Sequence, residues 1–119
     1  MKRSPIKRRS PSVTAKADVL FARLVQDSLG ERCFATGEQL TCNGYIQCCH
    51  VISRRYHAIR WDMDNAVPMC ASHHVYFTHH PLEWEEYVGP EIWKALRHRA
   101  LNDPPEKAAD ALKRLKEVA

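Results

Sequence analysis

The stretch CCHVISRRYHAIRWDMDNAVPMCASHH, residues 48–74, decides the fold and the chemistry that we predict for this chain of 119 residues. It lies within the segment from Cys33 to His80, which holds all five cysteines and six of the seven histidines. Cysteine and histidine are the usual ligands of zinc, and a neutral imidazole is the usual general base near pH 7. We therefore expect the functional site in this part of the chain.

Two short segments have the spacing of a structural zinc site. Cys70 and His73 form a C-x-x-H pair. Cys33 begins a matching C-x-x-T segment upstream, in which the second ligand position is Thr36, a poor zinc ligand. Cys42 or Cys48 can replace the threonine, since both follow Cys33 in the same segment. The alternative is that these cysteines are buried thiols of the core, with no zinc. The ligand set that we assign is Cys33, Cys48, Cys70 and His73.

A second group of side chains has the chemistry of phosphodiester hydrolysis. His50 follows an expected strand, and Asn65 and His74 come later in the chain. An imidazole can deprotonate a water, a bound divalent cation can neutralise the phosphate, and an amide can hold the imidazole in its reactive orientation. Asn65 is also open to a simpler interpretation as the N-cap of a following helix.

The periodicity of hydrophobic residues, together with glycines and prolines at the expected ends of helices and strands, predicts an α+β domain. Residues 15–29 predict an amphipathic helix with Val19, Leu20, Leu24 and Val25 on its apolar face, ended by Gly30. The glycines and β-formers of residues 33–48 favour a hairpin. Further helices are expected over residues 66–76, 81–88, 91–102 and 105–117, the last one capped by Asp103 and Pro104.

The positive charge of the chain lies in its N-terminal tail. The net charge is +4, but residues 1–17 hold six of the 18 basic residues and no acid, so residues 18–119 sum to −2. Proline, serine and this basic cluster predict a flexible tail over residues 1–14, followed by a domain over 15–103 and a C-terminal helix over 104–119. We expect the tail to bind nucleic acid through Lys7, Arg8 and Arg9, with a solvated leader as the alternative.

A second basic group lies beside His50. Arg54, Arg55 and Arg60 are predicted to contact phosphates, because residues 39–61 contain no acid. The alternative is that one of them pairs with Asp62 or Asp64. No apolar run reaches the ~20 residues that span a bilayer, and the first residues lack the apolar region of a signal peptide. We therefore expect an intracellular protein that does not act at a membrane.

Three blocks together resemble the HNH endonucleases, the His-Me finger nucleases, and most closely their small phage-type members. The blocks are CCHVISRRY over residues 48–56, RWDMDN over 60–65 and CASHH over 70–74. The resemblance implies a ββα-metal core, in which a hairpin and a helix grip one divalent metal, here with flanking helices and the basic tail. It also implies hydrolysis of DNA phosphodiester bonds, by nicking or by double-strand cleavage.

The resemblance also assigns roles to individual residues. His50 corresponds to the general base and His74 to a metal ligand, while Asn65 orients His50 or braces its loop. Cys49 stands where the family places another metal ligand, and we assign His79 to complete the site. Because a thiol stands at this position, the sequence does not decide which cation binds, and the candidates are Mg²⁺, Mn²⁺, Ni²⁺ and Zn²⁺. The zinc-containing members often have four cysteines where this chain has Cys33, Thr36, Cys70 and His73.

A non-catalytic role is the alternative. The same scaffold would then be a zinc-stabilised DNA-binding module, or an accessory subunit of a phage packaging or recombination complex. For the catalytic role, one site per chain predicts nicking by a monomer, and double-strand cleavage would need a homodimer or two successive nicks. By resemblance, the gene would belong to a phage or prophage, and the protein would act in the cytoplasm of the bacterial host.

Overall fold

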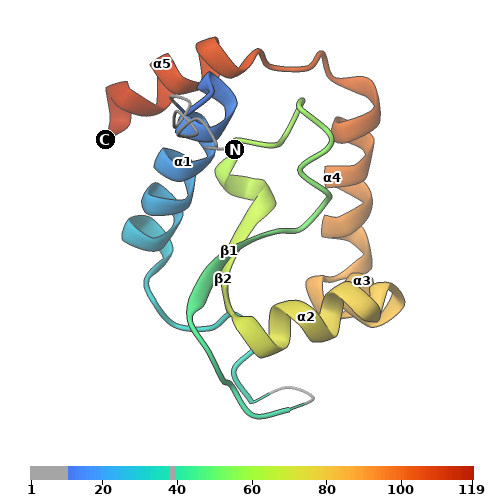
Figure 1. The fold of residues 1–119 in the computed structure, drawn as a ribbon. Helices are drawn as coiled ribbons and strands as arrows, with labels where there is room; N and C mark the ends of the chain where they lie inside the picture. Colours follow the sequence, from blue (N-terminus) through green and yellow to red (C-terminus); the bar gives the residue numbers. More distant parts are fainter. Residues whose placement is uncertain (1–10, 38–39) are drawn as a thin grey trace, which may run out of the picture.

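The computed structural model describes residues 11–37 and 40–119, and in these it has five α-helices, one 3₁₀ turn and a two-stranded antiparallel sheet (Figure 1). The predicted α+β class is therefore confirmed for the described residues. The basic residues predicted to bind nucleic acid in the tail, Lys7, Arg8 and Arg9, lie outside them. In chain order the elements are α1 (Val13–Leu29), β1 (Ile46–His50), η1 (Met63–Asn65), β2 (Ala66–Cys70), α2 (Ala71–His79), α3 (Pro81–Val88), α4 (Pro90–Asn102) and α5 (Ala108–Val118).

The sheet pairs β1 with β2 in a register that runs from Ile46 opposite Cys70 to His50 opposite Ala66. The hairpin expected within residues 33–48 is therefore wrong, because the partner strand comes from residues that we expected to begin a helix. Pairing with β1 and burial between the helices override local helix propensity here. The helix begins only at Ala71, where the thiol of Cys70 caps it by accepting a hydrogen bond from the backbone N–H of His73.

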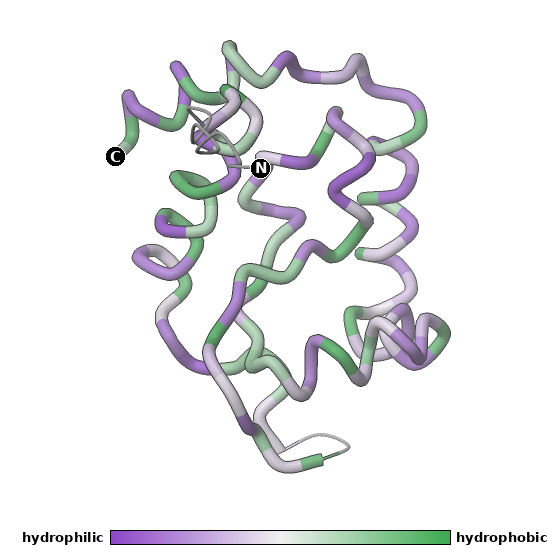
Figure 2. Tube along the Cα trace, viewed as in Figure 1, coloured by the Kyte–Doolittle hydropathy of each residue, from purple (hydrophilic) through white to green (hydrophobic). Residues whose placement is uncertain are grey.

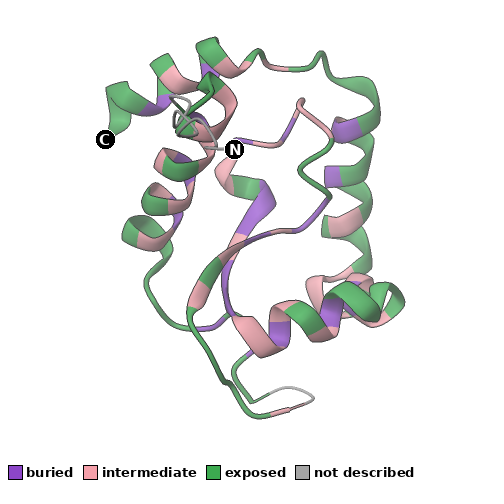
Figure 3. Cartoon of the chain, viewed as in Figure 1, coloured by how far each residue is buried: buried purple, intermediate pink, exposed green. Residues whose placement is uncertain are grey.

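Helices cover the sheet from two sides. α1 and α5 pack against each other on one side, whereas α2, α3 and α4 follow one another on the other side (Figure 1). Each side has its own apolar cluster. One contains Phe21, Trp61 and Leu115, and the other contains Met69, Phe77 and Trp84. Hydrophobic residues alternate with hydrophilic ones along the helices (Figure 2), and the buried residues follow β2 and the inward sides of the helices (Figure 3).

The helix faces and ends differ from the prediction in detail. α1 buries Ala17, Phe21 and Val25, so the apolar face is rotated away from Val19, which is 72% exposed. The helix also begins at Val13, inside the predicted tail, because the hydroxyl of Ser12 accepts a hydrogen bond from the backbone N–H of Ala15 and caps it. The helices over 81–88 and 91–102 are confirmed to within one residue.

The C-terminal helix begins later than predicted. α5 starts at Ala108 with Lys107 as its N-cap, whereas Asp103 is the C-cap of α4 and residues 104–107 are not helical. The carboxylate of Glu106, just before this helix, accepts two hydrogen bonds from Arg114. None of the described helices is long and apolar enough to cross a bilayer.

Candidate functional site

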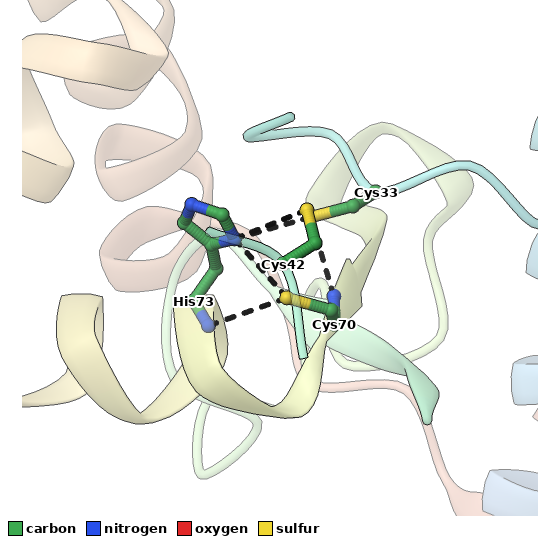
Figure 4. Close-up of side chains that lie close together, drawn as sticks. All are labelled: Cys33, Cys42, Cys70 and His73. Carbon is green, nitrogen blue, oxygen red and sulfur yellow. Dashed lines mark hydrogen bonds between the residues drawn. The ribbon is translucent and has the colours of Figure 1, made fainter. Parts of the chain in front are cut away.

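Four potential metal ligands converge at the start of α2. Their ligand atoms, the sulfurs of Cys33, Cys42 and Cys70 and Nδ1 of His73, all lie within 4.8 Å of one another (Figure 4). Nδ1 lies 3.6, 3.5 and 3.1 Å from these three sulfurs respectively. Zinc bonds of about 2.3 Å to sulfur and about 2.0 Å to nitrogen place the ligand atoms of a tetrahedral site about 3.5 Å apart. The four residues therefore fit a zinc ion.

Backbone N–H groups donate hydrogen bonds to two of the sulfurs and so favour the thiolate form that binds a cation. The N–H of Cys70 donates to the sulfur of Cys33 at 3.3 Å, and the N–H of His73 donates to the sulfur of Cys70 at 3.5 Å. Burial alone would raise the pKa of Cys70. Hydrogen bonds from the Ser72 hydroxyl and the backbone of His73 outweigh it, and the pKa of Cys70 falls to about 5. Cys70 is therefore a thiolate, the form of cysteine that binds metals.

A tight loop brings Cys42 to the other three ligands. The backbone N–H of Asn43 donates to the Ser72 hydroxyl at 3.0 Å, and the N–H of Ser72 donates to the carbonyl of Asn43 at 3.1 Å. Gly44 then passes so close to α2 that a Cβ atom there would lie 2.7 Å from the Cβ of Ala71. Its φ of +86° also favours glycine. The loop thus lies directly on the start of α2.

Gly44→Ala is expected to weaken zinc binding by about 10- to 100-fold, the range for groups that support metal ligands. The added methyl group must displace the loop from Ala71, and Cys42 moves with the loop. Gly37→Ala is the matched control, because Gly37 has the same φ of +86° but nothing within 4 Å of its Cβ position. Competition with a colorimetric zinc chelator measures the two affinities. Equal losses in both variants would contradict the close approach.

Of the four zinc ligands that we predicted, Cys33, Cys70 and His73 lie together in the structure, whereas Cys48 does not lie with them. Because successive side chains of a strand face opposite sides, Cys48 packs against the cluster of α1, away from the other three. Burial raises the pKa of Cys48 to about 11. The structure gives the fourth place to Cys42, which the sequence left open.

The second candidate site is a cleft of about 690 Å³ between α1, the end of β1 and α2. His50 and His74, which were predicted to lie together, both line it, and so does Arg54, one of the predicted phosphate-binding residues. The lining residues are Asp18, Ala22, Cys48, His50, Ser53, Arg54, His74 and Thr78.

His50 has one ring nitrogen fixed by the backbone. Its Nε2 lies 2.8 Å from the carbonyl oxygen of Arg60. A carbonyl can only accept, so Nε2 carries the proton and Nδ1 keeps its lone pair. Burial lowers the pKa of His50, and this outweighs the opposing effect of the Arg60 carbonyl. His50 is therefore a neutral imidazole with one basic nitrogen, as a general base requires.

His74 is arranged in the complementary way. Its Nδ1 donates to the amide oxygen of Gln47 at 2.7 Å, which leaves the lone pair on Nε2. Burial lowers the pKa of His74, so this imidazole is also neutral. A neutral imidazole held by a second group through its other nitrogen is the usual form of a histidine metal ligand.

Asn65 braces the loop that runs from His50 to Arg60. The buried amide accepts from the N–H of Ile52 at 2.8 Å and donates to the carbonyls of Ile52 and Ile59 at 3.0 and 3.2 Å. The resemblance implied that Asn65 either orients His50 or braces its loop. The contacts of Asn65 are those of a residue that braces the loop. The alternative as a helix N-cap is wrong, because β2 follows Asn65 directly.

Two predicted metal ligands do not lie with the lining residues of the cleft. Cys49 is buried on the other face of β1 and lines a smaller cavity of about 200 Å³, which His50 and His74 also border. Burial raises the pKa of Cys49 to about 12, so it is a neutral thiol. His79 is exposed, and because it follows His74 by five residues it is rotated by about 140° around α2. Thr78 lines the cleft in its place.

The three predicted phosphate-binding arginines have different environments. Arg54 and Arg55 are exposed, the latter with its guanidinium 5.5 Å from the ring centre of Tyr56. The prediction for Arg60 is wrong, because its side chain is only 13% exposed and is paired with Asp18. Asp62 and Asp64, the expected alternative partners of one of the three arginines, pair with Arg99 instead.

Sequence reasoning missed Asp18, although its position carries a signal. It precedes the buried Phe21 and Val25 by three and seven residues, which places a carboxylate on the inward face of α1. A carboxylate on an apolar face requires a partner. Burial alone would raise the pKa of Asp18, but hydrogen bonds from Arg60 and Trp61 outweigh it and lower the pKa.

The chain matches no protein-family model, no curated protein and no solved structure. The chemistry of the two sites is therefore the basis for assigning a function. The four ligands at the start of α2 can hold a cation between well-separated segments of the chain. The cleft is lined by an exposed arginine and two neutral imidazoles, side chains of the types that bind phosphates, accept protons and ligate cations.

Proposed function

We propose that this chain is a metal-dependent endonuclease of the HNH type, which hydrolyses phosphodiester bonds in DNA. The observation that carries the proposal is the cleft in which His50, His74 and Arg54 meet. His50 is a neutral imidazole with a lone pair on Nδ1, and His74 has its lone pair on Nε2. Arg54 is an exposed cation. A base, a metal ligand and a phosphate-binding group are the parts that metal-assisted hydrolysis needs.

In this proposal each residue has one task. Nδ1 of His50 accepts a proton from the attacking water, and Arg54 binds the phosphate beside the scissile bond. Nε2 of His74 would hold a divalent cation, and the chemistry that such an ion would supply is neutralisation of charge on the phosphate and the leaving oxygen. Asn65 keeps the loop between His50 and Arg60 in place.

The donor set of the cleft fits a cation that shares its ligands with the substrate. Among the described residues, the group at the start of α2 is the one that gathers three or more ligand side chains, so the cleft does not form an all-protein cage. Mg²⁺ and Mn²⁺ commonly take most of their ligands from water and substrate phosphates. An imidazole ligand also suits Mn²⁺, Ni²⁺ and Zn²⁺.

The experiment that tests the proposed function is a plasmid-nicking assay. The purified chain is treated with a mild chelator, its bound zinc is quantified, and it is incubated with supercoiled DNA and Mg²⁺, Mn²⁺, Ni²⁺ or Zn²⁺ in turn. We expect conversion to nicked circles with at least one of these cations. DNA binding without nicking under every condition would contradict the proposal.

His74→Ala is expected to raise the cation concentration needed for half-maximal nicking by about tenfold or more, because the cleft loses its imidazole ligand. His79→Ala is the matched control, since His79 lies on the same helix but is exposed and outside the lining of the cleft. Nicking rates measured across a cation titration separate the two variants. If His79→Ala raised the cation concentration for half-maximal nicking more than His74→Ala does, His79 would be the metal ligand, as expected from the sequence.

One observation favours a second candidate function, a zinc-stabilised DNA-binding module without catalysis. Cys49, which stands where HNH nucleases place a metal ligand, is a buried neutral thiol. A site with His74 as its main protein ligand holds a cation weakly unless DNA contributes. In this second candidate, the chain would bind DNA through Arg54 and Arg55 with little dependence on sequence.

A further inference from the structure

We propose that Asp18 on α1 is a positioning residue for His50, acting through the peptide between Arg60 and Trp61. This inference rests on the proposed function and deepens it. It assigns part of the catalytic arrangement to a helix outside the three sequence blocks that resemble the HNH nucleases.

The carboxylate of Asp18 anchors two consecutive side chains. Its Oδ1 accepts hydrogen bonds from Nε of Arg60 at 3.0 Å and from Nε1 of Trp61 at 2.9 Å, while its Oδ2 accepts one from Nη2 of Arg60 at 2.6 Å. The Arg60 side chain is 13% exposed and that of Asp18 is 27% exposed. This is a bidentate ion pair shielded from water, which has more fixed geometry than an exposed pair.

The anchored peptide is the one that holds His50. The carbonyl of Arg60 belongs to the peptide bond between Arg60 and Trp61, and it accepts the hydrogen bond from Nε2 of His50 at 2.8 Å. Because Asp18 fixes the side chains on both sides of this planar unit, it restricts the direction of the carbonyl. The carbonyl in turn decides which ring nitrogen of His50 carries the proton.

Loss of the Asp18 carboxylate would reach His50 through Arg60 and the peptide bond that follows it. Arg60 would become a largely buried cation whose remaining partners, the Arg54 carbonyl and Nε2 of His57, carry no negative charge, and moving the arginine toward solvent would relieve this cost. The carbonyl would then lose its fixed direction, and the proton of His50 would be shared between Nε2 and Nδ1. A proton on Nδ1 removes the lone pair that the proposed reaction uses.

The direct test is the tautomer of His50 in Asp18→Asn, measured by long-range ¹H–¹⁵N NMR correlation at a pH where the imidazole is neutral. We expect the Nε2–H form in the wild type and a mixture with the Nδ1–H form in the variant. Asp27→Asn is the matched control, because it makes the same charge change at an exposed position of the same helix. An unchanged tautomer in Asp18→Asn, or an equal change in both variants, would overturn the inference.

Cleavage kinetics supply a second readout. At saturating DNA, the rate for Asp18→Asn should fall by about 10- to 100-fold, the effect of a misplaced reacting group, while its Kd for DNA matches that of Asp27→Asn. A loss that appears only in DNA affinity would count against positioning. If the wild type cuts no DNA, the proposed function fails, but the tautomer measurement still decides whether Asp18 orients His50.

A double variant protects the test against misfolding. Asp18→Asn combined with Arg60→Met removes both charges, so no unpaired ion is left in the interior and the fold is expected to persist. In the Arg60→Met background Asp18 keeps only its hydrogen bond from Trp61, which the amide oxygen of asparagine can still accept, so adding Asp18→Asn there should change the tautomer ratio less than adding it to the wild type. Additive effects of the two substitutions would contradict an action of Asp18 through Arg60.

Discussion

Replacing His50 with alanine is expected to lower the rate of DNA cleavage by about 10²- to 10⁴-fold, the usual contribution of a general base. The reason is that His50 provides the basic Nδ1 in the cleft, whereas its Nε2 is already used by the Arg60 carbonyl. The affinity for DNA should change little, because Arg54 and Arg55 remain exposed. Single-turnover nicking of supercoiled plasmid at saturating protein measures the chemical step separately from binding.

His98→Ala serves as the control for this change. His98 is an exposed histidine on α4, and its imidazole contacts the side chain of Asn102 in the same helix. It should cleave like the wild type. Both variants should also keep their zinc content and melting temperature, which shows that the fold is intact. A His50→Ala protein that cleaves at the wild-type rate would remove the catalytic role of this residue.

Replacing Cys42 with alanine is expected to weaken zinc binding by about 100-fold and to lower the melting temperature. Structural zinc sites bind with about 10–16 kcal/mol, so one of four ligands accounts for about 3 kcal/mol of a domain stability of about 5–15 kcal/mol. Cys42 is exposed, so without a metal its removal would cost almost nothing. A large loss of stability at this exposed position would therefore report a metal directly.

Cys48→Ala separates the two possible ligand sets. Cys48 is half-buried against the cluster of α1 and is not one of the four converging residues. This variant should keep one zinc per chain and lose about 1 kcal/mol or less through packing. Zinc content by mass spectrometry and thermal unfolding by circular dichroism measure both variants. If Cys48→Ala lost the zinc and Cys42→Ala kept it, the ligand set expected from the sequence would be right.

Local signals in the sequence were sufficient where an element depends on its own residues. Pro81 and the Gly89–Pro90 pair mark the helix boundaries found at α3 and α4. The C-x-x-H spacing of Cys70 and His73 places both residues at the start of one helix, where their ligand atoms meet. Spacing within one helical turn is a property of the backbone, so no tertiary information was needed.

Elements that depend on a distant partner could not be predicted in this way. The segment Ala66–Cys70 is a strand because β1 lies beside it, and its own residues do not distinguish a strand from the start of a helix. The choice between Cys42 and Cys48 depends on which side of β1 faces the zinc ligands, and the loop at Gly44 decides this by docking on α2. The pairing of Arg60 with Asp18 likewise joins residues far apart in the chain.

We infer that one chain has two metal sites with different tasks. In this proposal Cys33, Cys42, Cys70 and His73 would hold a structural zinc, and the cleft of His50 and His74 would take the cation used for cleavage. Anomalous diffraction at the zinc and manganese edges, from crystals grown with Mn²⁺, tests this most directly. We predict a zinc peak among the four ligands and a manganese peak beside His74. Manganese found only among the four ligands, in a protein that nicks DNA with Mn²⁺, would contradict the account.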